Sequence, residues 1–246
     1  MVNVSRLIAL LAIPVLFPGA AAAQTVDEVL TARFDGRFLE AADLAEGLGT
    51  SEGYALGAQA LAIYGHHLAP TREEAQSTLL RAIDLAEKAV ELDDSNPLAH
   101  QELAHAMGRY AETLPTTEAL SGGYAEKTIA SMRRGLELDP DFLYGHLAVA
   151  GWHARIINAA GFLGALIYGA SEDEAIAHYQ RATELGPDNV IVMAGHAIGL
   201  LMLDDDDYRG QVEELLARIE AAPKEDAYER LMHEEVLKHL EAIDGS

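Results

Sequence analysis

Apolar side chains recur at helical spacing along most of the chain after residue 25. The clearest stripe has steps of four, three and three residues and consists of Ala175, Tyr179, Ala182 and Leu185. The dipeptide Gly186-Pro187 then predicts the end of this helix, because glycine accepts left-handed geometry and proline cannot continue the turn. No useful length of sequence alternates apolar and polar residues with period two. The pattern therefore predicts an all-α protein.

The same unit occurs three times. Three predicted helices end in Glu-Leu-Asp-Asp, Glu-Leu-Asp-Pro and Glu-Leu-Gly-Pro, which begin at Glu91, Glu137 and Glu184, 46 and then 47 residues apart. A period of this size is typical of stacked helix pairs. We therefore expect residues 24–246 to form one right-handed α-solenoid of about five helix pairs with a C-terminal capping helix.

Between these units the sequence indicates where helices begin and where the pattern breaks. Predicted capping residues at Thr25, Thr71 and Ser171 are each followed by glutamate three residues later. The predicted interruptions are a linker at 49–53, an irregular stretch at 109–123 and an apolar insert at 156–170.

The first 23 residues have the pattern of a secretory signal peptide. Arg6 is their only charged residue, Leu7 to Phe17 is apolar, and Ala21 to Ala23 offers small side chains for cleavage after Ala23. The apolar run is too short to span a bilayer, so a membrane anchor is the weaker interpretation. We expect a periplasmic or secreted product without a stable membrane span.

Charge and cysteine content restrict the classes of function. Loss of Arg6 with the signal leaves 16 basic and 40 acidic residues, a formal charge of −24. Such a surface repels nucleic acid and anionic headgroups. The chain has no Cys, which excludes disulfides, thiol catalysis and thiolate metal sites. An exported chain of this kind depends on its apolar core for stability.

The run from Ala175 through Tyr179 and Ala182 to Pro187 resembles the second helix of a tetratricopeptide (TPR) repeat. The resemblance covers about residues 52–222, although the period exceeds the 34 residues of that family. The long inserts and the signal resemble exported bacterial repeat proteins related to transporter-associated TPR subunits. They also resemble the microtubule-regulator-like repeat group. The resemblance implies a groove that binds a protein or peptide.

Two arginines and a histidine are predicted to lie in that groove. Arg109 and Arg155 are 46 residues apart, at equivalent places near the ends of successive first helices. First helices usually line the concave face of a solenoid, so the pair predicts a clamp for a carboxylate. The alternative, modestly favoured, is that each arginine pairs with acidic neighbours. His105 is included with them among the predicted binding residues.

The apolar insert at 156–170 supplies the other predicted binding residues. With fifteen residues and three glycines it is too short for a membrane span. Its large apolar side chains either pack on the solenoid as additional core or form a recognition surface at the mouth of the groove. The recognition hypothesis assigns that role to Phe162, Leu166 and Tyr168.

The sequence gives little support for metal binding or catalysis, so we predict no metal, no cofactor and no enzymatic activity. His100, His146 and His153 fall on packing stripes and are interpreted as core residues. The adjacent pair His66-His67 is expected to point to different sides of its helix. The four aspartates at 204–207 are spaced for a helix cap and not for a calcium loop. No nucleophile elbow or phosphate-binding loop is present.

Two functions remain open from the sequence. The first is an exported scaffold for protein–protein interactions in the cell envelope. The alternative is a small-ligand or solute-binding accessory subunit of a periplasmic transporter. An open groove with polar walls would favour a peptide or protein partner, and a closed apolar pocket would favour a small ligand. The segments 109–123 and 156–170 are the predicted roof of such a pocket.

Overall fold

The computed structural model describes residues 25–244 of the chain, and these form twelve helices and no strand. The signal-peptide prediction for residues 1–23 lies outside this range. The helices are α1 (Val26–Phe34), α2 (Phe38–Leu48), α3 (Ser51–His67), α4 (Arg72–Leu92), α5 (Pro97–Glu112), α6 (Thr116–Ser121), α7 (Tyr124–Leu138), α8 (Leu143–Tyr168), α9 (Glu172–Leu185), α10 (Val190–Leu203), α11 (Asp205–Ala221) and α12 (Ala227–Asp244).

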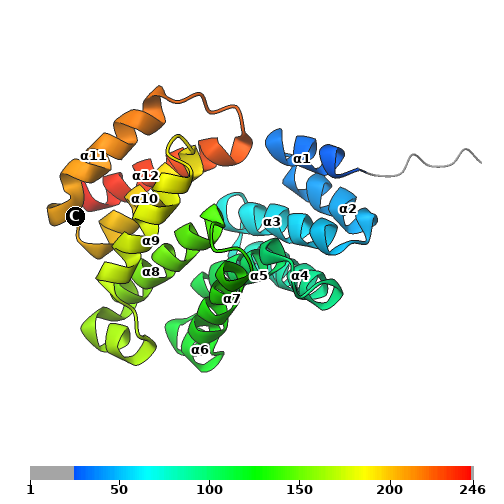
Figure 1. The fold of residues 1–246 in the computed structure, drawn as a ribbon, viewed down its shortest axis with the longest axis horizontal. Helices are drawn as coiled ribbons and strands as arrows, with labels where there is room; N and C mark the ends of the chain where they lie inside the picture. Colours follow the sequence, from blue (N-terminus) through cyan, green and yellow to red (C-terminus); the bar gives the residue numbers. More distant parts are fainter. Residues whose placement is uncertain (1–24, 245–246) are drawn as a thin grey trace, which may run out of the picture.

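The predicted solenoid is confirmed. Five antiparallel pairs follow one another along a curved stack, namely α1/α2, α3/α4, α5/α7, α8/α9 and α10/α11, and α12 follows the last pair (Figure 1). The short helix α6 fills the connection inside the third pair. Each pair buries one face against the next, which is how a repeat array builds a continuous core.

The helix starts are where the capping pattern predicts them. Thr25, Thr71 and Ser171 each accept a hydrogen bond from the backbone N–H of the glutamate three residues later. Asp204 serves two helices, because it ends α10 and its carboxylate accepts the N–H groups of Asp206 and Asp207 at the start of α11. This is the helix-capping role that the sequence predicts for the aspartate run.

The predicted stripes form the core. Leu79, Ala82, Ala86 and Ala89 of α4 are buried, as are Ala175, Tyr179 and Ala182 of α9. One large cluster joins α1–α5, and a second joins α10, α11 and α12. Small alanines dominate the first cluster, so neighbouring helices approach closely.

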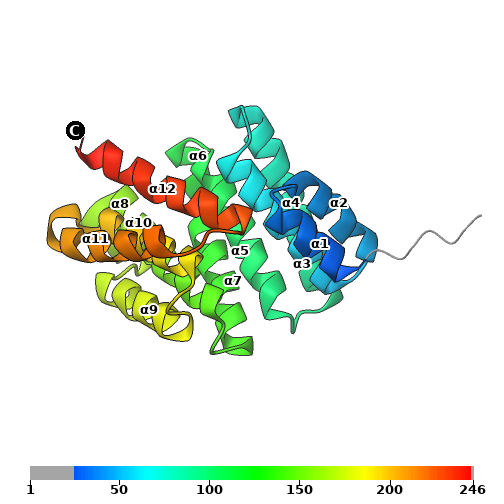
Figure 2. The ribbon, with the colours of Figure 1, turned by 90° about the horizontal axis from the view of Figure 1, so that it is seen from above.

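The last helix does not simply extend the stack. α12 packs along α10, and its first turn reaches α1 at the other end of the chain (Figure 2). Ala227 and Tyr228 contact the core cluster of the first pairs, and Arg33 of α1 pairs with Asp226 at 2.8 Å. The curved stack is thereby closed across its concave side.

The predicted interruptions are partly wrong. The linker at 49–53 ends early, because Thr50 caps α3 and the helix begins at Ser51. The segment 109–123 is mostly helical, since α5 continues to Glu112 and α6 follows. The segment 156–170 continues α8 to Tyr168, with a break at Gly161, whose φ of +56° is a conformation that favours glycine.

Among the described residues, no single helix is long and apolar enough to cross a membrane. The consecutive helices α8 and α9 would together be long and apolar enough, but the chain bends by 103° between them.

Candidate functional site

A cavity of about 610 Å³ lies between the concave face of the solenoid and α12. Its walls come from α1, α3, α5, α8 and α10, the first helices of the five pairs, together with α6, α7, α12 and Tyr179 of α9. This confirms that first helices line the concave face. Most lining side chains are apolar or aromatic, among them Tyr124, Tyr144, Trp152, Tyr179, Ile198 and Tyr228. The roof is α12, with a smaller part from α6. Of the predicted roof segment 156–170, Ile156 and Ala159 line the cavity and residues 160–170 do not.

The structure brings the two predicted groove arginines together around one carboxylate. Glu112 Oε2 lies 3.1 Å from Arg109 Nη1, and Glu112 Oε1 lies 2.8 Å from Arg155 Nε. Burial raises the pKa of Glu112, but Arg109 and then Arg155 outweigh that effect and hold the pKa at about 2. The pairing with an acidic neighbour therefore describes both arginines better than an open clamp. Arg109 is buried, whereas the Arg155 side chain is 36% exposed.

His105 also lines the cavity and has an acidic partner. Its Nδ1 lies 3.0 Å from Glu102 Oε2, and Glu102 Oε1 accepts a hydrogen bond from Gln59 Nε2 at 2.8 Å. Glu102 itself is only 3% exposed. The pair therefore forms a second polar point in a largely apolar wall.

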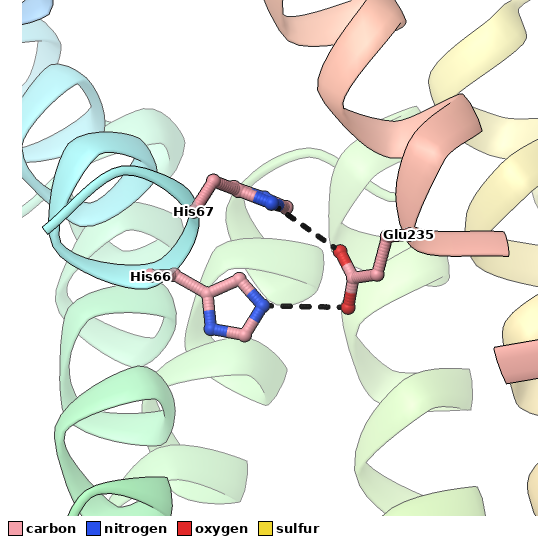
Figure 3. Close-up of side chains that lie close together, drawn as sticks. All are labelled: His66, His67 and Glu235. Atoms are coloured by element: carbon pink, nitrogen blue, oxygen red, sulfur yellow. Dashed lines mark hydrogen bonds and ion pairs between the residues drawn. The ribbon is translucent and has the colours of Figure 1, made fainter. Parts of the chain in front are cut away.

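A third polar cluster joins the end of α3 to α12 (Figure 3). His66 Nε2 lies 3.3 Å from Glu235 Oε1, and His67 Nδ1 lies 3.6 Å from Glu235 Oε2. The expectation that His66 and His67 point to different sides is wrong. They occupy the last two positions of α3, and the two oxygens of one carboxylate face both rings.

Burial controls the protonation of this cluster. Desolvation, followed by the neighbouring His66, lowers the pKa of His67 to about 3, and desolvation followed by Arg109 also lowers the pKa of His66. Burial raises the pKa of Glu235, but the hydrogen bond from His66 and the charge of Arg109 outweigh it, and the pKa lies well below its usual range. At neutral pH the cluster therefore holds two neutral imidazoles and one carboxylate.

The predicted recognition residues at the end of α8 divide into two groups. Phe162 is 80% exposed and Leu166 is 70% exposed, and Leu163 and Ile167 between them are exposed to a similar degree. Tyr168 instead packs against the core cluster that contains Trp152. The interpretation of this segment as additional core is therefore wrong for Phe162, Leu163, Leu166 and Ile167, and holds for Ile156 and Tyr168.

The interpretation of other histidines as core residues is confirmed for two of them. His100 is buried with its Nε2 2.9 Å from the Asp94 carbonyl, and buried His153 accepts the Ser171 N–H at 3.0 Å. His146 lies nearer the surface, where its Nδ1 is 2.8 Å from Nδ1 of His178. Sequence spacing alone does not indicate this contact within the α8/α9 pair, because it depends on how the two helices pack.

Comparisons with known proteins agree with the fold. A thermophilic TPR protein from Thermus thermophilus superimposes with a TM-score of 0.56 at 18% identity, covering 87% of this chain and 96% of that one. At this identity the likeness shows the fold alone. A search of curated proteins finds none that matches. The family described as regulator of microtubule dynamics protein 1-3 matches residues 55–244, which is more than half of the chain. The chain thus belongs to the regulator of microtubule dynamics protein 1-3 family.

Proposed function

We propose that this protein is an exported helical-repeat scaffold of the cell envelope, which takes a segment of a protein partner into its concave cavity. The observation that carries the proposal is the 610 Å³ cavity bounded by successive first helices and α12. The TPR-like fold supports protein binding by analogy, and the family name refers to the regulation of a protein assembly. Catalysis has no part in the proposal.

The chemistry of the cavity suggests what such a segment looks like. Aromatic rings and small residues give a surface that favours apolar side chains, because burying each large one contributes about 1.5–3 kcal/mol. Arg155 is the polar group best placed to contact a carboxylate of the partner, since its side chain is partly exposed while Arg109 is buried. An extended, largely apolar segment with one acidic group therefore fits best.

Site-specific photo-crosslinking tests the proposal directly. A photoreactive amino acid replaces Ile156, which lines the cavity, and in a control replaces Leu80, which is exposed on α4 outside it. In cells that express each variant, we expect a discrete crosslinked protein adduct from position 156 and none from position 80. Equal labelling from both positions, or labelling of 80 alone, would refute capture in the cavity.

Arg155→Gln tests the polar contact without stranding a buried charge. Arg109 remains to neutralise Glu112, so the fold is expected to persist. A charge-assisted hydrogen bond to a partner contributes about 1.5–3 kcal/mol, and the partner's affinity should fall accordingly. Replacing Arg109 as well would leave Glu112 without a buried partner, which confuses binding with stability.

A second function is favoured by one feature, the covering of the cavity by α12. The cavity volume lies in the range of about 300–1,000 Å³ that is typical of small-molecule sites. A covered cavity of this size suits a solute-binding accessory subunit of a periplasmic transporter. Native mass spectrometry of protein purified from the envelope separates the two functions. A releasable small molecule would support the transporter function, whereas peptide adducts would support the scaffold.

Export is the remaining component of the proposal, and the support for it is the pattern of residues 1–23. Intact-mass measurement of the purified protein should give a chain beginning at Gln24. An intact Met1 on a cytosolic protein would refute export while leaving the cavity-binding proposal open.

A further inference from the structure

The cluster of His66, His67 and Glu235, where α3 meets α12, has more hydrogen-bond acceptor atoms than N–H groups to donate to them. Both nitrogens of His66 face carboxylates, since Nδ1 lies 3.5 Å from Glu112 Oε2 and Nε2 lies 3.3 Å from Glu235 Oε1. A neutral imidazole has only one N–H and can donate to only one of them. Glu235 Oε2 is buried and has no hydrogen-bond donor among the described residues. A buried acceptor without a donor is costly, so the arrangement calls for an electron-pair acceptor.

We propose that His66, His67 and Glu235 bind one divalent transition-metal ion, with zinc the best match. One ligand atom from each residue can be chosen so that all three lie within 4.8 Å of one another. Metal–nitrogen and metal–oxygen bonds of zinc are about 2.0–2.2 Å, so two ligands of a tetrahedral ion are about 3.4 Å apart. His66 Nε2 lies 3.3 Å from Glu235 Oε1, and His67 Nδ1 lies 3.6 Å from the other oxygen, Oε2, so each histidine is close to that separation from one oxygen of the carboxylate.

The donor set selects among ions. Two imidazoles with one carboxylate suit zinc and its first-row neighbours, whereas calcium and magnesium prefer oxygen donors alone. Three protein ligands leave a further coordination position for water. Because Glu235 also lines the cavity, the ion would lie at the margin of the cavity.

The surrounding residues supply the outer contacts that such a site needs. Metal-binding histidines usually donate their second ring N–H to a carboxylate, which fixes the tautomer. Glu112 is positioned to accept from His66 Nδ1, and Arg109 and Arg155 hold Glu112 in place. The nearby charges do not oppose a cation, because Glu102, Glu112 and Glu235 outnumber the two arginines.

A bound ion would join α3 to α12. The ion pair between Arg33 of α1 and Asp226 already connects the start of α12 to the first helix pair. The ion would therefore strengthen the closure of the solenoid. This property is separate from partner capture, and its test uses the metal alone, so failure of one proposal does not affect the other.

The test is titration of the chelator-treated protein with Zn²⁺ by calorimetry, and with Co²⁺ by visible absorption. We expect one ion per chain with high affinity, ligand-field bands from bound cobalt, and a higher melting temperature in the presence of zinc. Glu235→Gln and His67→Gln should each weaken zinc binding by at least ~100-fold, since loss of an outer-shell contact alone costs about 10–100-fold. Both variants should lose the thermal stabilisation by zinc.

His146→Gln is the matched control, because it removes a histidine from the separate pair with His178. Its zinc affinity should equal that of the unaltered protein. Affinity that survives in both Glu235→Gln and His67→Gln, or is lost in His146→Gln instead, would overturn the site. If Glu235→Gln fails to fold, His67→Gln decides alone. At 3.6 Å from Glu235 Oε2, the His67 ring makes no hydrogen bond to this carboxylate, so its replacement should not break a contact that the fold needs.

Discussion

The pH dependence of stability should carry the signature of His196. This residue of α10 stacks on Tyr179 of α9, with ring centroids 4.7 Å apart and planes 12° apart. Its Nδ1 lies 3.4 Å from the Thr183 hydroxyl. Burial lowers the pKa of His196 to about 4, whereas the unfolded chain should have the ordinary value of about 6.5. Between about pH 6.5 and pH 4, His196 therefore binds a proton in the unfolded state but stays neutral in the folded state.

The sign and size of the effect follow from linkage. Because the folded pKa is the lower one, stability is unaffected above pH 6.5, falls as the pH decreases from 6.5 to 4, and then levels off. Between pH 7.5 and pH 5.0 this single group should reduce the free energy of unfolding by about 2 kcal/mol. Other titrating groups add their own dependence, so the contribution of His196 must be obtained by difference.

The assay is urea unfolding followed by circular dichroism at pH 7.5 and pH 5.0. His196→Gln cannot titrate, so the difference in stability between the unaltered protein and this variant should shrink, or reverse, by about 2 kcal/mol at the lower pH. Tyr179→Phe is the control, because it keeps the stacked ring and His196, and should retain the pH dependence of the unaltered protein. A difference that is the same at both pH values within about 0.5 kcal/mol would refute the assignment.

Three further predictions concern packing, exposure and closure. Gly199→Ala should destabilise the fold by about 1–3 kcal/mol in urea unfolding, since the added methyl would collide with a buried tyrosine hydroxyl, whereas Gly210→Ala on exposed α11 should gain up to ~1 kcal/mol; equal effects would contradict this. Phe162→Ala combined with Leu166→Ala should leave the melting temperature unchanged, and a clear drop would show that these side chains are core. Asp226→Asn should cost at least ~2 kcal/mol by stranding the arginine of α1, and an unchanged urea midpoint would show that this contact does not secure α12.

The repeat architecture could be predicted because it is local. Each stripe, such as Ala175 with Tyr179 and Ala182, is set by helical periodicity, and each end is set by a Gly, Pro or capping residue nearby. The equivalence of Arg109 and Arg155 across one period also predicted correctly that they lie together. What periodicity could not show is that a single carboxylate, Glu112, neutralises both.

The rest depends on contacts between distant parts of the chain. The stripe of α12 shows that this helix packs on something, but not that it reaches α1. The convergence of His66 and His67 on Glu235 depends on where α12 packs. Two adjacent residues are about 100° apart around a helix, so the sequence of α3 alone does not predict that they share a partner. Phe162 is likewise exposed because none of the described helices packs over that turn, which composition cannot reveal.

The contact between α12 and α1 also changes how the protein should come apart. A linear repeat array loses its terminal units first, because each unit is held by one neighbour only. Here the first and last helices hold each other, so neither end can fray without breaking contacts at the other. The closed chain should unfold as one cooperative body, and deletion of α12 should loosen the N-terminal pairs at the far end of the sequence.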